Sequence, residues 1–181
     1  MAIGHETKTK SKFAHEPQER QGSCGSFVCG ADLRFRPITI ADLDEIMAIE
    51  RASYPFPWSS NFFRQELQVA CARSVLVELH GTILGYVLFW LLPGAVDIHN
   101  VAVHLDYRRR GIASMLLERV ISEARDHGAA RVLLEVRKSN LPAQSLYQRI
   151  GFIVTGVRKG YYSDNGEDAL AMTLDLAIVG S

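Results

Sequence analysis

Apolar residues recur along this chain with two different periods, and each period predicts its own kind of element. Alternating apolar and polar residues, or a short continuous apolar run, predict a β-strand. Segments of this kind lie at residues 33–36, 74–79, 83–92, 96–104, 131–136, 152–159 and 169–176. Apolar residues spaced by three and four predict about four helices, at residues 43–53, 60–67, 112–126 and 141–150. The order of elements predicts one mixed α/β (α+β) domain around a seven-stranded sheet.

The sheet should be mostly antiparallel, because tight turns join several of its strands. His80-Gly81 and Pro93-Gly94 are turn dipeptides between neighbouring strands. The strand at 96–104, in contrast, reaches the strand at 131–136 only through a helix. A crossover of this kind makes the two strands parallel. We therefore expect one parallel pair in an otherwise antiparallel sheet.

The turn that opens this crossover carries the strongest chemical signal. Its residues are first basic and then small: Arg108, Arg109, Arg110, Gly111, Ala113 and Ser114. Glycine lets the backbone approach a ligand without a Cβ in between, and the first N–H groups of a helix have no intrahelical acceptor. The helix dipole adds positive charge, so the turn is a candidate cradle for a phosphate or pyrophosphate. A solvated basic corner is the alternative. The turn matches neither a Walker loop nor a three-glycine dinucleotide fingerprint.

Composition limits the classes of partner. The chain has 181 residues and a formal net charge of zero, so bulk charge favours neither a nucleic acid nor a membrane surface. No apolar run reaches the length of a membrane span, and the N-terminus lacks the apolar core of a signal peptide. Cys24, Cys29 and Cys71 are an odd count without a disulfide framework. Free thiols are typical of the cytosol, with a zinc site at the first two as the alternative. We expect a cytoplasmic protein.

The two ends of the chain carry no periodic pattern. Residues 1–32 are polar and end in a glycine-rich run, which predicts a flexible or disordered N-terminal extension. Residues 33–176 form the predicted domain, and residues 177–181 form a C-terminal tail.

Two aromatic segments stand apart from the regular elements. The segment Tyr54–Ser59 follows the first helix, and its two prolines exclude a helix there. It is either a wall for a bound peptide or other acceptor, or a loop that packs its own aromatics. Tyr161 and Tyr162 begin a polar segment that runs to Asp168 and is long for a plain hairpin loop.

Several motifs, in this order along the chain, resemble a known family. Residues 108–113 match the Q/R-x-x-G-x-G/A acetyl-CoA signature of the GNAT N-acetyltransferase superfamily. The run Leu134–Asn140, followed by Ala143, Leu146-Tyr147 and Gly151-Phe152, is similar to one branch of it. That branch contains the RimI-type and archaeal-type protein N-terminal acetyltransferases.

Two further motifs resemble the same branch: Phe56-Pro57-Trp58-Ser59 near the first helix, and Tyr161-Tyr162 before Gly166-Glu167-Asp168-Ala169. The resemblance covers about residues 33 to 176. It implies the GNAT fold, in which the parallel strand pair splays apart at the acetyl-CoA site. His99 and Leu105 depart from the RimI pattern, which has an aliphatic residue and a proline at these places.

The resemblance implies that the basic turn holds the pyrophosphate of acetyl-CoA and that the preceding strand faces its pantetheine and acetyl group. The implied cofactor-binding residues are Val101, Ala102, Val103, Arg108, Arg109, Arg110, Gly111, Ile112, Ala113, Ser114 and Asn140. A main-chain amide freed near Val101 to Val103 would polarise the thioester carbonyl, a contribution of ~3 kcal/mol by analogy with oxyanion donors. Asn140 also suits a helix cap, and the two roles are compatible. The implied reaction uses no metal.

Two residues carry the implied proton transfers. Amine acetylation removes a proton from the attacking ammonium and returns one to the departing thiolate. The resemblance assigns the general base to Glu135, acting directly or through water, and the general acid to Tyr147. A phenol is protonated at neutral pH and can donate to the sulfur. Without the resemblance, Glu135 is a strand-end carboxylate and Tyr147 is a core aromatic.

Phe56, Trp58, Tyr161 and Tyr162 would flank the acceptor. The implied acceptor is a protein or peptide N-terminus, with the N-terminal alanine of a ribosomal protein as one candidate. We expect a monomer or weak homodimer without a nucleic-acid or membrane partner. Two other functions remain open, an acetyltransferase for a small amine or antibiotic and a catalytically silent acyl-CoA-binding module.

Overall fold

Seven strands form one sheet in the order β1-β2-β3-β4-β5-β7-β6 in the structure, a computed structural model that describes residues 33–177. The strands are β1 Leu33–Arg36, β2 Ala72–Leu79, β3 Thr82–Leu92, β4 Ala95–Val103, β5 Arg131–Arg137, β6 Ile153–Tyr162 and β7 Glu167–Asp175. The helices are α1 Leu43–Ser53, α2 Ser60–Glu66, α3 Ile112–Asp126 and α4 Leu141–Ile150, with 3-10 turns η1 Ile40–Asp42 and η2 Leu105–Tyr107. Only β4 and β5 pair in parallel, so the predicted fold is confirmed.

Two predictions fall on parts of the chain outside this range. The N-terminal extension, residues 1–32 with Cys24 and Cys29, lies outside the described residues, and so do residues 178–181 of the predicted tail. Cys71 lies within the described part and is a free thiol.

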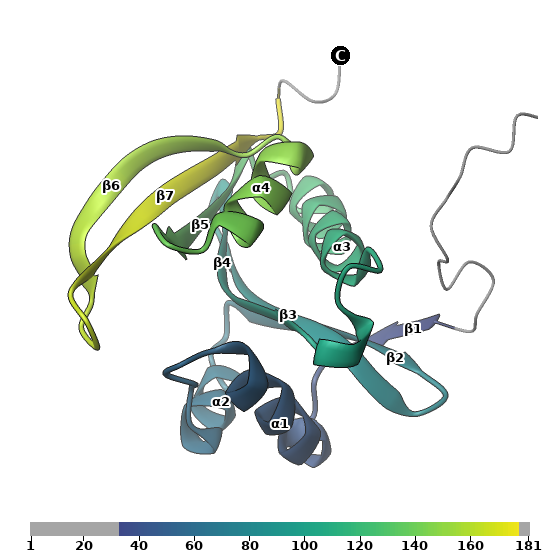
Figure 1. Ribbon diagram of the computed structural model, residues 1–181. Coiled ribbons are helices and arrows are strands. Elements are labelled where there is room, and N and C mark those ends of the chain that lie inside the picture. Colours follow the sequence, from purple (N-terminus) through teal and green to yellow (C-terminus); the bar gives the residue numbers. More distant parts are fainter. Residues whose placement is uncertain (1–32, 178–181) are drawn as a thin grey trace, which may run out of the picture.

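Helices cover both faces of the sheet (Figure 1). α1 and α2 pack on one face of its β2–β4 half, and α3 and α4 lie on the opposite face. Successive side chains of a strand point to opposite faces, so β3 serves both layers: Tyr86 and Leu88 pack with α1, whereas Val87 and Phe89 pack with α3. This double burial explains why the sequence of β3 is an almost continuous apolar run.

The parallel pair is joined along only part of its length. Pairing between β4 and β5 extends from Ala95 opposite Arg131 to Ile98 opposite Leu134. β4 then continues to Val103 and β5 to Arg137 without further ladder pairs between them. β4 also contains a bulge, since its register against β3 shifts at His99. The two strands therefore splay apart, which leaves main-chain groups of β4 free on one edge.

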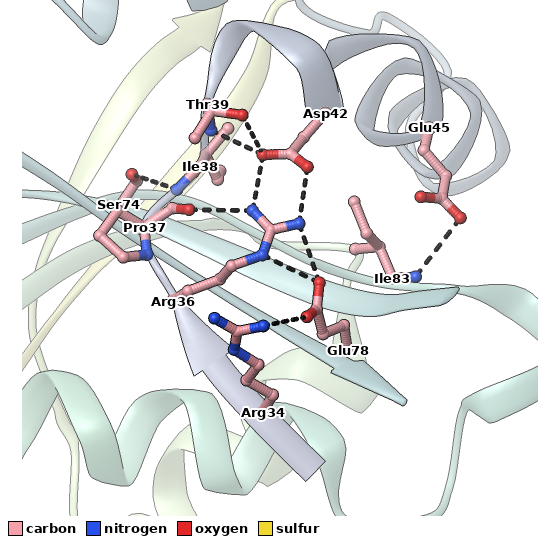
Figure 2. Close-up of polar contacts among 10 residues, drawn as sticks. All are labelled: Arg34, Arg36, Pro37, Ile38, Thr39, Asp42, Glu45, Ser74, Glu78 and Ile83. Carbon is pink, nitrogen blue, oxygen red and sulfur yellow. Dashed lines mark hydrogen bonds and ion pairs between the residues drawn. The ribbon is translucent and has the colours of Figure 1, made fainter. Parts of the chain in front are cut away.

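Arg36 ties the first strand to the first helix and to β2. Its guanidinium donates to both carboxylate oxygens of Asp42, at 2.8 and 2.7 Å, and its Nε donates to Glu78 at 2.9 Å (Figure 2). Asp42 also accepts the N–H of Thr39 at 2.7 Å, which completes a capping box. The hydrogen bond from Arg36 is the main reason why the pKa of Asp42 lies well below its usual value. This cluster fixes the start of the segment that leads into α1.

The last hairpin differs from the prediction. β6 continues to Tyr162 and β7 begins at Glu167, so the predicted loop from 161 to 168 is reduced to residues 163–166. Gly166 adopts a φ of 69°, and its N–H donates to the Tyr162 carbonyl at 2.7 Å. The hairpin projects beyond the rest of the sheet (Figure 1), where most residues of β6 are exposed on both faces. Exposure on both faces removes the apolar alternation by which a strand is recognised.

Candidate active site

A cavity of about 610 Å³ opens where β4 and β5 splay apart. The predicted site residues that line it are Phe56, Trp58, Val101, Glu135, Asn140, Tyr147, Tyr161 and Tyr162. They come from the loop after α1, from β4 and β5, from α4 and its cap, and from the end of β6. The fold therefore brings together segments from both ends of the domain. The basic turn, residues 108–114, lies outside this cavity, and so do Ala102 and Val103.

Glu135 and Tyr147 reach the cavity from opposite faces of the sheet. Tyr147 of α4 is 7% exposed and belongs to the core that contains Leu134 and Val136 of β5. Glu135 lies between these two residues, so its side chain points to the other face. Both nevertheless line one cavity, because the missing pairing beyond Leu134 leaves a passage between the strands. Two ligands, one bound on each side of the sheet, could meet at this opening.

The carboxylate of Glu135 lies in a charged, half-buried setting. Burial raises its pKa, and the neighbouring charge of Asp97 raises it further. Arg158 of β6 acts in the opposite direction, because its guanidinium lies 2.9 Å from the Glu135 carboxylate. His99 forms a longer contact with Asp97, 3.7 Å between Nε2 and Oδ2. A carboxylate with a raised pKa is a better proton acceptor, as a general base requires.

Tyr147 is suited to donate a proton. Burial is the first cause that raises the pKa of its phenol, with the nearby Tyr162 as a second cause. Its hydroxyl makes no hydrogen bond to another residue of the described range, although its ring contacts Phe152 at a centroid distance of 5.8 Å. The aromatic ring is thus part of the core while the hydroxyl is available to a ligand in the cavity.

The basic turn has the backbone of an anion cradle. Gly111 caps α3 with a φ of 81°, and Arg109 also has a positive φ, 63°. Ile112 is buried and anchors the start of α3, whose first N–H groups have no intrahelical acceptor. Ser114 lies in the first turn of α3 and lines a second groove, of about 380 Å³, between α3 and α4.

The three arginines of this turn have different surroundings. Arg108 points back into the protein, where its Nε donates to the Val103 carbonyl at 3.1 Å and its Nη2 to Ser53 Oγ at 2.9 Å. All three residues are exposed, but Arg109 and Arg110 make no side-chain hydrogen bond within the described residues, and the guanidinium of Arg110 lies 5.3 Å from the ring centre of Tyr107. The side chain of Arg108 therefore supports the turn, and only the next two are free to face an anion.

Main-chain groups of β4 alternate between its two edges. The His104 N–H donates to the Leu84 carbonyl at 2.8 Å, which places residue 104, and by alternation Ala102, on the edge toward β3. Val101 and Val103 then point their N–H and C=O groups toward the splay. Among the three β4 residues implied by the family resemblance, these two present main-chain groups to a ligand, whereas the backbone of Ala102 is directed to β3.

Asn140 serves as a helix cap at the rim of the cavity. Its side-chain oxygen accepts the N–H of Ala143 at 3.2 Å, and proline follows at the start of α4. Because the oxygen is engaged, the side-chain NH₂ group is what Asn140 can offer to a ligand.

Aromatic side chains form the two walls of the cavity. Phe56 is 58% exposed, whereas Trp58 packs against Phe62 at a centroid distance of 4.4 Å. On the opposite wall, the rings of Tyr161 and Tyr162 meet at 5.2 Å in an edge-on arrangement. Within the loop after α1, Trp58 therefore packs internally, whereas Phe56 faces outward.

Among the residues described, the structure contains no group of three or more His, Cys, Asp or Glu side chains arranged to hold a metal ion. None of the helices in this part of the chain is long and apolar enough to cross a membrane.

Comparison with known proteins identifies the family. Residues 43–152 match the Acetyltransferase (GNAT) family. This chain belongs to that family.

A [ribosomal protein bS18]-alanine N-acetyltransferase of Escherichia coli is 32% identical over 139 residues, covering 76% of this chain and 93% of the relative. An N-alpha-acetyltransferase of Saccharolobus solfataricus is 33% identical over 160 residues, covering 81% and 95%. The crystal structure of the Escherichia coli ribosomal-protein-S18-alanine N-acetyltransferase superposes with a TM-score of 0.73 at 31% identity, covering 80% of this chain and 94% of that one.

Membership of the GNAT family makes this chain an acetyl-CoA-dependent N-acetyltransferase. The family match includes the basic turn, Glu135 and Tyr147, while the β6–β7 hairpin follows it in sequence. The Escherichia coli relatives extend the similarity over most of the domain.

Sequence reasoning missed a buried carboxylate beneath the aromatic loop that follows α1. Glu50 of α1 is 1% exposed and accepts hydrogen bonds from the Trp58 N–H at 2.9 Å, from the Tyr86 hydroxyl and from the Asn100 side chain at 3.2 Å. Three donors compensate one buried carboxylate. The sequence did contain a signal for this buried charge, because Glu50 occupies a position on the apolar stripe of α1.

Arg137 is the second residue that the sequence analysis did not single out as part of the site. At the end of β5, its guanidinium donates to both oxygens of Asp164, at 3.0 and 2.8 Å, and to Glu167 at 3.2 Å. It also lies 3.8 Å from the ring centre of Tyr162. Arg137 therefore holds the tip of the β6–β7 hairpin, and with it one aromatic wall, against the strand that carries Glu135.

Proposed function

We propose that this acetyltransferase transfers the acetyl group of acetyl-CoA to the N-terminal α-amino group of a protein, directly within a ternary complex. The observation that carries the proposal is the single cavity that Tyr147 enters from one face of the sheet and Glu135 from the other. The names of the Escherichia coli and Saccharolobus solfataricus relatives support the same acceptor class.

On this proposal the basic turn and the free edge of β4 hold acetyl-CoA, the co-substrate that supplies the acetyl group. Main-chain N–H groups between Arg109 and Ser114 would bind its pyrophosphate. The amides of Val101 and Val103 would lie along the part that bears the thioester, and the Asn140 side chain would bond the cofactor arm. The left-handed backbone at Gly111, which a residue with a Cβ adopts only with strain, supports this assignment.

Two side chains would move protons. Glu135 would accept the proton that the acceptor ammonium loses, directly or through a water molecule, and Tyr147 would donate one to the departing sulfur. The raised pKa values of both groups support these roles, since the carboxylate becomes more basic and the phenol stays protonated.

The acceptor would enter between the aromatic walls. Phe56 and Trp58 on one side and Tyr161 and Tyr162 on the other would favour an unblocked chain terminus. Because the Escherichia coli relative is named for the alanine of ribosomal protein bS18, we propose a protein that starts with alanine, such as a ribosomal protein, as the first acceptor to test. Such an acceptor also suits a cytoplasmic enzyme.

The decisive experiment is an acetylation assay on a peptide array, read by mass spectrometry with acetyl-CoA as donor. Peptides that start with alanine or serine should outperform both N-terminally blocked versions of the same peptides and small amines. A small amine that is acetylated faster than every peptide would overturn the proposed acceptor class. Absence of transfer to any amine would instead favour a silent acyl-CoA-binding module.

Glu135→Gln tests the proposed base in the same assay. The substitution keeps the size of the side chain and removes its basicity, so turnover should fall by about 10²-fold while acetyl-CoA binds nearly as before. Normal turnover of this variant would contradict the role of Glu135 and leave the acceptor class standing.

A further inference from the structure

The free edge of β4 carries two carbonyl groups as well as two amides, and protein donors occupy both carbonyls. The Tyr54 hydroxyl donates to the Val101 carbonyl at 2.6 Å, and Arg108 Nε donates to the Val103 carbonyl at 3.1 Å. The pairing between β4 and β5 has ended at Ile98 and Leu134, so these bonds take the place of a neighbouring strand. What remains on this edge of the described chain is the pair of N–H groups of Val101 and Val103.

The two donors are linked to each other through the end of α1. Arg108 also donates to Ser53 Oγ at 2.9 Å, and Ser53 is the chain neighbour of Tyr54. Tyr54 in turn begins the loop that carries Phe56 and lines the same cavity. One short segment therefore joins the aromatic wall of Phe56 and Trp58, where the acceptor would enter, to the strand edge on which the thioester would lie.

We infer that Tyr54 is a positioning residue for acetyl transfer: it caps the Val101 carbonyl, so that the splayed edge of β4 offers only hydrogen-bond donors to the thioester. The inference rests on the proposed function and adds a residue to it. An uncapped carbonyl oxygen would face the negative charge that develops on the thioester oxygen and would repel it. The positive end of the phenol O–H dipole offsets part of the negative charge on a capped carbonyl oxygen, and the hydrogen bond holds the peptide plane in place.

The same bond connects the loop that carries Phe56 and Trp58 to the free edge of β4. A tyrosine hydroxyl at 2.6 Å fixes the loop to β4, next to the Val101 amide. Glu50 fixes the other end of that loop through the Trp58 N–H at 2.9 Å. The loop is thus attached at both ends, and the Tyr54 bond is the attachment that touches the free edge.

Tyr54→Phe is the test, because it removes one oxygen atom and keeps the ring. At saturating acetyl-CoA and peptide, kcat should fall by about tenfold, while KM for acetyl-CoA changes by less than about twofold, since the cradle at Gly111 is untouched. Tyr107→Phe is the matched control: the Tyr107 ring packs on His104, and its hydroxyl has no hydrogen-bond partner within residues 33–177. This control should retain the wild-type kcat.

A spectroscopic readout separates positioning from a general loss of structure. Acetyl-CoA labelled with ¹³C at the thioester carbonyl is bound to each full-length protein without acceptor. The carbonyl resonance should shift downfield on binding to the wild-type protein, and by less on binding to Tyr54→Phe, whose thermal unfolding is measured in parallel. An unchanged kcat, or a kcat loss with an unchanged carbonyl shift, would overturn the inference. A wild-type protein without transferase activity would overturn the proposed function instead.

Discussion

The ion pair between Arg158 and Glu135 offers a direct test of the proposed base. Arg158 lies on β6, its side chain is 58% exposed, and its guanidinium lies 2.9 Å from the Glu135 carboxylate, which is 20% exposed. Arg158 lowers the pKa of Glu135, while burial and Asp97 raise it. Replacing Arg158 by Gln removes the larger of two lowering contributions, the other being that of His99. The pKa of Glu135 should therefore rise.

The size of this change follows from the exposure of the pair. Half-exposed ion pairs contribute about 0.3–1 kcal/mol, because water screens them. At about 1.4 kcal/mol per pKa unit this corresponds to a rise of roughly half a unit. A base accepts protons only when it is deprotonated, so activity increases as the pH rises through its pKa. Arg158→Gln should thus move the acidic limb of the pH profile upward by about half a unit.

The assay is kcat/KM for an alanine-starting peptide as a function of pH, which reports on groups of the free enzyme. The α-amine of the peptide also titrates, with a pKa of about 8, but equally for both enzymes. The ratio of wild-type to Arg158→Gln activity therefore cancels the amine and reports on the groups near Arg158, among which Glu135 is its ion-pair partner. It should be close to one at high pH and rise to about threefold below the pKa of the carboxylate.

Lys159→Gln is the matched control. Lys159 is the next residue on β6, and its ammonium pairs with Asp168 at 2.8 Å, away from Glu135. This variant should keep a constant activity ratio across the pH range. A downward shift of the acidic limb in Arg158→Gln, or equal shifts in both variants, would refute the assignment of the limb to Glu135.

Three further variants test other parts of the structure. Tyr147→Phe should lower turnover by about 10²-fold with acetyl-CoA affinity, measured calorimetrically, nearly unchanged; equal turnover would remove the proposed acid. Arg137→Met should release the hairpin that holds Tyr162, raising the peptide KM by about tenfold but leaving the acetyl-CoA KM alone; a change in both would indicate wider disruption. Arg36→Met should lower the free energy of unfolding by about 1–2 kcal/mol at neutral pH in urea titrations. Since the folded-state pKa of Asp42 is depressed, this stabilisation is fully present above the unfolded pKa of about 4 and is lost only as the pH falls through the lower folded-state pKa. The gap between wild type and variant should therefore narrow progressively as the pH is lowered below about 4, and a gap that does not narrow would contradict the assignment.

Short-range patterns of the sequence predicted most of the fold. The capping box at Thr39 and Asp42, the cap of α4 at Asn140 and the left-handed Gly111 all depend on residues within a turn of each other. Periodicity predicted the helices and six of the strands to within a few residues, and the crossover predicted the parallel pair. The anion cradle could likewise be inferred from its own residues, because its physics is local to one strand–turn–helix unit.

Short-range patterns did not predict which residues make up the site, since the roles of Glu135 and Tyr147 entered only through family resemblance. Neither residue carries a local signal that distinguishes a catalytic group from a strand-end carboxylate or a core aromatic. Their meeting in one cavity depends on the point at which β4 and β5 stop pairing, which is a property of the whole sheet.

Only the tertiary structure decided which groups of the predicted set are engaged within the protein and which line the cavity. Arg108 belongs to the signature motif, yet it turns inward to the Val103 carbonyl, because the splay leaves that carbonyl without a strand partner. Ala102 directs its backbone to β3 for the opposite reason, since the ladder on that edge is intact. The registers of β5 with β7 and of β7 with β6 bring Arg158 next to Glu135. The sequence thus determined the local elements, whereas the pairing of distant strands determined which groups remain free for chemistry.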